Sequence, residues 1–216
     1  MSTSAPVFHC FISILTSVIN LTRNGSLVTF DLRADFPGLE YVPEVLVDTD
    51  RLIHTTFWDE FMTDFMDNSV VNVCGLLTVI ASTNRGNEPV LKLQAFNVIP
   101  MPGWPNTDTY KEYMPAVEPP SVSFIATLDR VTGAQNETRF LHFRLSAYDA
   151  SSKTNVSWAF VGIIKANKRW EKTISPKAGR QIQVSGLLCG FISVSSQENI
   201  PNLVVEIAAM NVLPIA

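Results

Sequence analysis

A dense cluster of cations and one tryptophan lies between positions 165 and 172 of the 216-residue chain. Lysine and arginine bind phosphate oxygens, and an indole ring stacks on an unpaired base, a contact that contributes about 1–3 kcal/mol per base. The cluster therefore predicts a surface for a polyanion that also carries flat rings. The alternative is a solvated charged face with the indole packed inside the protein. The cluster consists of Lys165, Lys168, Arg169, Trp170 and Lys172.

A second candidate set lies on a strand-like segment around position 142. Its alternating residues Leu141, Phe143 and Leu145 predict one buried face, because successive strand side chains point to opposite sides. We expect the other face to meet solvent, where a ring, an imidazole and a guanidinium suit unstacked bases and phosphates. That face carries Phe140, His142 and Arg144.

Trp158 is the last candidate for stacking on a base. It lies in the segment 156–162, which is apolar on both faces of a strand. Because aromatic side chains contribute most to stability when they are buried, core packing is the competing interpretation for Trp158.

Patterns typical of catalysis and metal binding are missing from the sequence. It contains no Walker A, GxGxxG, HExxH or GxSxG motif. His9 and His54 are lone histidines, and Asp48 and Asp50 form a DxD pattern without the surroundings of a metal site. We therefore expect no enzymatic activity, no cofactor and no metal ion.

The cysteines and the apolar runs bear on location. Cys10, Cys74 and Cys189 are widely spaced and form no CxxC pair, so we expect an intracellular, reducing compartment, nuclear or cytoplasmic. The first apolar run, from Val7 to Ile19, lacks the positive region of a signal peptide. No run reaches the ~18 residues of a membrane span, so we expect no membrane partner.

Charge is distributed unevenly along the chain. The whole chain carries −4 at pH 7, which excludes a uniformly basic nucleic-acid coat. Residues 1–102 carry −6, residues 103–120 carry −2 and residues 121–216 carry +4. We therefore expect the C-terminal part to attract a polyanion and the N-terminal part to repel it, which leaves the N-terminal part for a protein partner.

The sequence contains an internal repeat with an offset of 111–114 residues. Four blocks recur in the same order, and Gly75 and Gly186 fall at the same place in one of them. A repeat of this kind indicates two copies of one structural unit. The matched blocks are 11–15 with 124–128, 28–32 with 141–145, 71–77 with 182–188, and 96–100 with 210–214.

A proline-rich segment separates the two copies. Six of the 13 prolines lie between positions 100 and 120, and segments of this composition are semi-rigid spacers. We therefore expect an acidic domain over 1–102, a linker over 103–120 and a basic domain over 121–216.

Each copy contains five strand candidates. Asn24-Gly25 is a tight-turn signal between the first two strands of the first copy. Alternation and β-branched residues place the strands of the first copy at about 8–19, 26–34, 45–56, 71–81 and 90–99.

A helix candidate lies between the third and fourth strands. Apolar residues at positions 58, 61, 62, 65 and 66 have helical spacing, which predicts a helix over 58–66. Thr56 and Asp59 resemble a capping box at its start. The second copy has a weaker, basic equivalent over 166–173.

This order of five strands with one helix, in about 100 residues, resembles the OB-fold, a five-stranded Greek-key barrel. The segments Gly75-Leu76-Leu77 and Gly186-Leu187-Leu188 look like the fourth strand that follows the helix. The resemblance covers essentially the whole chain. It implies a mainly β protein of two tandem OB-like barrels, whose second and third strands and adjoining loops bind oligonucleotides or oligosaccharides.

These features favour a non-enzymatic protein that binds single-stranded DNA or RNA, DNA slightly more than RNA, mainly through the second copy. We expect stacking on Phe140, Trp158 and Trp170. The nine residues expected to contact nucleic acid are Phe140, His142, Arg144, Trp158, Lys165, Lys168, Arg169, Trp170 and Lys172.

Two other functions compete with nucleic-acid binding. A scaffold for protein partners, or a homo-oligomer of OB-like units, is favoured by the net acidity and by the absence of a nucleotide-binding signature. An extracellular β-sandwich that binds glycans would use the Asn-x-Ser/Thr sequons, although the N-terminal sequence argues against secretion. The sequons lie at Asn20, Asn24, Asn136 and Asn155.

Overall fold

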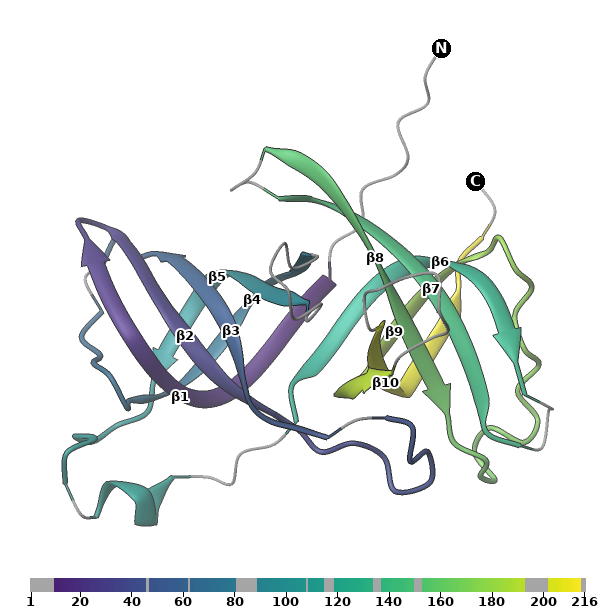
Figure 1. Cartoon of the computed structure of the whole chain (residues 1–216), viewed down its shortest axis with the longest axis horizontal. Helices are drawn as coiled ribbons and strands as arrows, with labels where there is room; N and C mark the ends of the chain where they lie inside the picture. The colour runs from purple at the N-terminus through teal and green to yellow at the C-terminus, as the bar shows by residue number, and fades with distance from the viewer. Residues whose placement is uncertain are drawn as a thin grey trace.

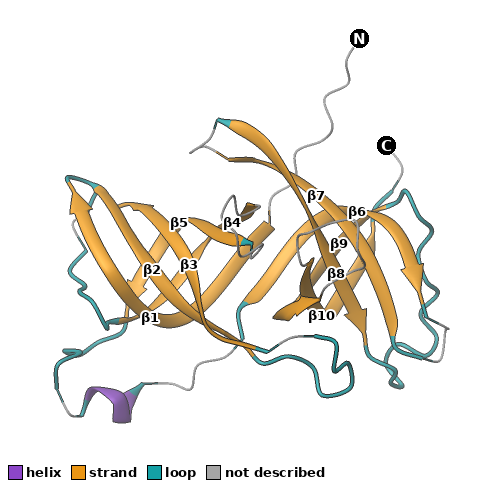
Figure 2. Ribbon diagram, in the orientation of Figure 1, coloured by secondary structure: helices purple, strands orange, loops and turns teal. Residues whose placement is uncertain are grey.

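The computed structural model consists almost entirely of β-strands, drawn in orange in Figure 2. It describes residues 10–45, 47–61, 63–80, 89–107, 109–114, 119–133, 137–149, 153–192 and 202–214. Within these residues there are ten strands and one short 3-10 helix, Tyr110–Tyr113. No helix formed by the described residues is long and apolar enough to span a membrane. The prediction of a mainly β chain is confirmed.

The first five strands pair in a closed ring, in the order β1-β2-β3-β5-β4 and back to β1. The β3–β5 pair is parallel, and the other four pairs are antiparallel. We call this ring barrel one. Its strands are β1 (Cys10–Asn24), β2 (Leu27–Phe36), β3 (Asp48–Trp58), β4 (Val70–Ile80) and β5 (Val90–Pro100).

The last five strands repeat this arrangement, in the order β6-β7-β8-β10-β9 and back to β6. Again one pair, β8 with β10, is parallel, and the other four are antiparallel. We call this ring barrel two. Its strands are β6 (Ser121–Thr132), β7 (Arg139–Asp149), β8 (Thr154–Ile164), β9 (Gln181–Ile192) and β10 (Asn202–Val212).

The first strand of each ring closes its barrel by pairing with two neighbours. β1 pairs with β4 through residues 10–17 and with β2 through residues 18–24. Its register shifts between Ile19 and Thr22, where Asn20 has a φ of 55°, a left-handed conformation that asparagine tolerates better than most residues. β6 has a similar shift between Leu128 and Arg130. A bulge of this kind bends a strand, so that its two ends can pair with different neighbouring strands.

The two barrels are also joined to each other through their first strands. β1 and β6 pair antiparallel from Cys10 opposite Phe124 to Ser13 opposite Ser121. The ten strands therefore form one continuous hydrogen-bonded sheet that is rolled into two rings.

Two glycines mark equivalent places in the barrels. A Cβ atom on Gly75 would lie 2.4 Å from the carbonyl oxygen of Gln94 on β5, and one on Gly186 would lie 2.1 Å from that of Glu206 on β10. Only glycine lets the neighbouring strand approach this closely. The repeat therefore placed Gly75 and Gly186 correctly.

Each barrel sends one connection across to the other, as Figure 1 shows. The β2–β3 connection lies against barrel two, where the Gly38 N–H donates to the carbonyl of Cys189 at 2.7 Å. The Tyr41 hydroxyl donates to Glu206 at 2.7 Å. In the other direction, Ala147 and Tyr148 near the tip of the β7–β8 hairpin border a groove on barrel one.

The expected helix over 58–66 is wrong. Residues up to Trp58 belong to β3, and the described residues from Asp59 to Ser69 form turns and irregular chain. Trp58 and Phe61 are 63% and 91% exposed, whereas Phe65 of the same stripe is buried, so the apolar positions do not form one buried helical face. Thr56 lies inside β3 and caps nothing. The basic segment 166–173 also forms turns rather than a helix.

An ion pair fastens this connection to barrel one in place of the helix. The Asp59 carboxylate is buried, lies 2.9 Å from the Arg23 guanidinium and accepts the Thr63 hydroxyl at 3.0 Å. The ring of Phe65 packs edge-on against Phe30 in the core. Burial raises the pKa of Asp59, but the hydrogen bonds from Thr63 and the contact with Arg23 outweigh it and bring the pKa below its ordinary value.

Asp59→Asn should flatten the dependence of stability on acid pH. Because the pKa of Asp59 is lower in the folded state, its contribution is complete above the ordinary pKa of about 3.8 and is lost as the pH falls through the folded pKa. Chemical unfolding at pH 7 and at several pH values below 4 measures the effect. Asp59→Asn is expected to be less stable than wild type at pH 7 and to lose less on acidification.

Asp64→Asn is the matched control, since Asp64 is an exposed carboxylate on the same connection. It should follow the wild-type pH profile. Equal pH profiles for wild type and Asp59→Asn would show that the buried pair does not stabilise the fold.

Candidate nucleic-acid interface

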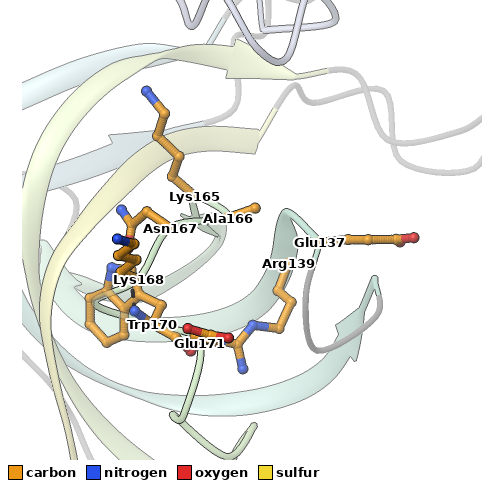
Figure 3. Close-up of a pocket in the computed structure, with 8 residues that line it drawn as sticks. All are labelled: Glu137, Arg139, Lys165, Ala166, Asn167, Lys168, Trp170 and Glu171. Atoms are coloured by element: carbon orange, nitrogen blue, oxygen red, sulfur yellow. Dashed lines mark hydrogen bonds between the residues drawn. The ribbon is translucent and has the colours of Figure 1, made fainter.

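A pocket of about 440 Å³ lies where β7 begins and β8 ends. Its walls come from the first residues of β7 and from the β8–β9 connection, as Figure 3 shows. Three of the residues expected from the sequence, Lys165, Lys168 and Trp170, come together here. Arg139 lies between them and Glu137 in the view of Figure 3.

Arg139 fastens the β8–β9 connection to barrel two. Its side chain is buried, and its guanidinium donates to the carbonyl oxygens of Thr173 and Trp170 and to the Ser175 hydroxyl at 2.7–3.1 Å. Among the described residues no carboxylate forms an ion pair with it, and its Nε has no hydrogen-bond partner. Burial lowers the pKa of Arg139, but an arginine stays charged because its ordinary pKa is above 12.

Trp170 lies in the core of barrel two, so the expectation that it faces outward is wrong. Its residue is 9% exposed and belongs to the main hydrophobic cluster. The Arg169 guanidinium lies 5.2 Å from the ring centroid. Lys168, Arg169 and Lys172 remain exposed. Burial of the indole therefore does not bury their charges, because long cationic side chains keep their heads in water.

The other two aromatic candidates are also covered. Trp158 is 7% exposed and packs beside Phe160, whose ring stacks on Phe124 at 4.8 Å, so the core interpretation of Trp158 is correct. Phe140 is half-buried against a second cluster that contains Val161 and residues of the β2–β3 connection. None of the three expected rings is exposed, and of the three only Trp170 forms part of the pocket wall.

The alternation of β7 is confirmed. Leu141, Phe143 and Leu145 are fully buried, and Arg144 is exposed. Arg144 lies 3.0 Å from the carboxylate of Asp129, an exposed ion pair of a kind worth about 0–1 kcal/mol.

His142, two residues before Arg144, is half-buried. Burial lowers its pKa, and so does the charge of Arg130, while Asp129 raises it. His142 and Arg144 lie further along β7 than the pocket and do not line it.

The cations of the β8–β9 connection are all exposed: Lys165, Lys168, Arg169 and Lys172. The ammonium of Lys165 lies 4.5 Å from the centroid of the Tyr41 ring, on the connection that comes from barrel one. Burial raises the pKa of Tyr41, and its hydrogen bond to Glu206 raises it further, so Tyr41 is neutral. A row of cations beside a pocket can bind phosphate groups.

Sequence reasoning missed several exposed aromatic residues, among them Tyr148 and Trp58. Tyr148 is 54% exposed and continues the outward face of β7, so the same alternation could have found it. Trp58 is 63% exposed and lies opposite Leu27 in the β2–β3 register. Trp58 comes two residues after Thr56 and therefore lies on the same face of β3. The helical spacing of the apolar residues that follow led to the prediction of a helix there instead.

No protein-family model matches the sequence, and no curated protein matches it. Among solved structures, wild-type single-stranded DNA binding protein from Thermus aquaticus is similar to 96% of this chain over 94% of its own, with a TM-score of 0.53 and 10% identity. A deletion variant of the same Thermus protein is similar to 97% of this chain over 95% of its own, with a TM-score of 0.49 and 12% identity. The chain has an OB-fold. The OB-fold expected from the sequence is thus confirmed, although the helix is missing.

Trp170→Ala should destabilise the OB-fold by about 3–5 kcal/mol, because it leaves a cavity in the core of barrel two. Thermal and chemical unfolding of the variant measure the loss. Trp104→Ala is the matched control, since Trp104 is 63% exposed, and it should change stability by about 0.5 kcal/mol or less. A wild-type Tm for Trp170→Ala would contradict the placement of the indole in the core.

Proposed function

We propose that this protein binds single-stranded nucleic acid and holds its phosphates on barrel two, without catalysing a reaction. The observation that carries the proposal is the row of four exposed cations on one connection of an OB-fold: Lys165, Lys168, Arg169 and Lys172. DNA is the favoured form, because a solved structure with a similar fold is a single-stranded DNA binding protein.

The charge distribution supports this assignment. Residues 121–216 carry +4, and this total includes the buried Arg139, whose charge lies next to the exposed row. Glu137 and Glu171 also line the pocket. We therefore place the phosphates along the exposed cations rather than deep in the pocket.

The outer face of β7 extends this row toward barrel one. Arg144 and Tyr148 lie on that face, and a strand of 11 residues is about 33 Å long. Phosphates compete readily for Arg144, because its exposed pair with Asp129 is weak. The bound nucleic acid would run from the β8–β9 connection along β7 to Tyr148.

A protein-interaction scaffold is the second candidate function. One observation favours it, an apolar groove of about 540 Å³ along the β1–β6 junction. Phe11, Phe96 and Leu187 line it and are 48%, 57% and 39% exposed. Such a surface is typical of a contact with another protein. A scaffold that binds no nucleic acid would fail the titration below, which separates the two functions.

Removal of two lysines from the row should reduce the salt dependence of binding. Each phosphate contact with a single strand contributes about 0.7 to the slope of log affinity against log salt. For Lys168→Ala/Lys172→Ala we expect the slope to become about 1.4 shallower. Fluorescence anisotropy with labelled dT and rU oligomers at several salt concentrations measures the slope.

Arg33→Ala is the control for a lost positive charge, since Arg33 is exposed on barrel one. Its slope should equal that of wild type. If wild type binds neither oligomer at low salt, the proposed function is wrong. If the double variant keeps the wild-type slope, the row of lysines is not the phosphate contact.

A further inference from the structure

The outer face of barrel one carries a regular grid of polar side chains. The strand register places Thr29 opposite Thr56 and Thr56 beside Gln94, across β2, β3 and β5. The next row along the same strands contains Asp31, His54 and Lys92. With strands about 4.8 Å apart, each row spans about 10 Å between its outer strands.

A groove of about 690 Å³ covers this grid, and barrel two forms part of its wall. The outer side of the groove includes Ala147 and Tyr148 from the β7–β8 hairpin. The exposed ring of Tyr148 therefore borders a groove whose lining from barrel one combines the polar grid with leucine side chains. Barrel one supplies the floor of the groove, and Ala147 and Tyr148 are the residues that barrel two adds to its wall.

The same face of barrel two is closed instead of open. On the outer face of barrel two, the parallel pair β8–β10 places Val161 beside Val204, whereas the parallel pair β3–β5 of barrel one places Thr56 beside Gln94. Val161 and Val204 are at most 1% exposed, because Leu39 and Val42 of the β2–β3 connection pack on them. In barrel two this outer face is therefore covered by apolar packing, whereas in barrel one its polar side chains remain accessible.

The chemistry of the groove suits an uncharged ligand. Both carboxylate oxygens of Asp31 are occupied, one by the Asn20 amide at 2.9 Å and one by the His54 ring nitrogen at 2.5 Å. Thr56 and Gln94 can each donate and accept hydrogen bonds. The excess of acidic groups on residues 1–102 disfavours phosphates here.

We propose that this groove binds the unpaired bases of the strand, while the cations of barrel two bind its phosphates. The inference rests on the proposed function and specifies which half of the molecule reads which half of the ligand. Tyr148 stacks on a base, and the hydroxyl and amide groups of Thr56 and Gln94 contact base edges. Because these groups both donate and accept, they accommodate every base. The acidic barrel thereby contributes affinity without contacting phosphate.

The test compares two oligomers of equal length, one of dT and one with an abasic phosphodiester backbone. Tyr148→Ala and Thr56→Ala/Gln94→Ala are expected to weaken binding of the dT oligomer about 10-fold, as loss of a stacked base does. Binding of the abasic oligomer should not change, since its phosphates contact barrel two. Tyr148→Phe should bind the dT oligomer as wild type does, because the ring is kept.

Gln183→Ala is the matched control, since Gln183 is exposed on β9 of barrel two. It should bind both oligomers as wild type does, and unfolding curves should show that every variant is folded. If wild type binds neither oligomer, the proposed function itself fails. If wild type binds but the groove variants bind the dT oligomer normally, or lose both oligomers equally, the inference is overturned.

Competition gives an independent result. Thymidine, which has a base but no phosphate, should displace the dT oligomer partly from wild type and not from Tyr148→Ala. Displacement by chitotetraose in place of thymidine would assign the groove to a sugar and would also overturn the inference.

Discussion

Both barrels depend on a first strand that bends. β1 and β6 each pair with two strands of their own barrel, and the register shifts near Asn20 and Arg130 let them do so. The straight beginnings of the two strands remain free to pair with each other. This shared pairing fixes the two rings relative to one another.

In each barrel the chain around the connection between the second and third strands contacts the other barrel, but the two contacts differ. The β2–β3 connection is apolar and seals the outer face of barrel two through Leu39 and Val42. The β7–β8 hairpin approaches a polar face and leaves a groove bordered by Tyr148. A symmetric repeat thus yields an asymmetric molecule. The charges also differ between the barrels. The acidic barrel one carries the open groove, and the basic barrel two carries the row of exposed cations.

In both barrels, an aromatic ring and an arginine hold the connection in which the OB-fold has its helix. An aromatic ring enters the core from the connection, Phe65 in barrel one and Trp170 in barrel two. An arginine then holds the connection, Arg23 through Asp59 and Arg139 through backbone carbonyls. In barrel two the arginine has no carboxylate partner among the described residues. The same structural need therefore leaves the charge of Arg139 beside the row of exposed cations.

The sequence by itself determined which residues lie on each side of a strand and that the chain repeats. Alternation placed Leu141 inside and Arg144 outside, and the repeat placed Gly75 and Gly186 at the same close contact. It misassigned Trp58 to a helix and Trp170 to the surface. Local patterns show the direction of a side chain but not whether another part of the chain covers it. Only the tertiary structure decided that the β2–β3 connection closes one outer face and that Tyr148 borders the other, because these contacts join residues of different barrels that are far apart in the sequence.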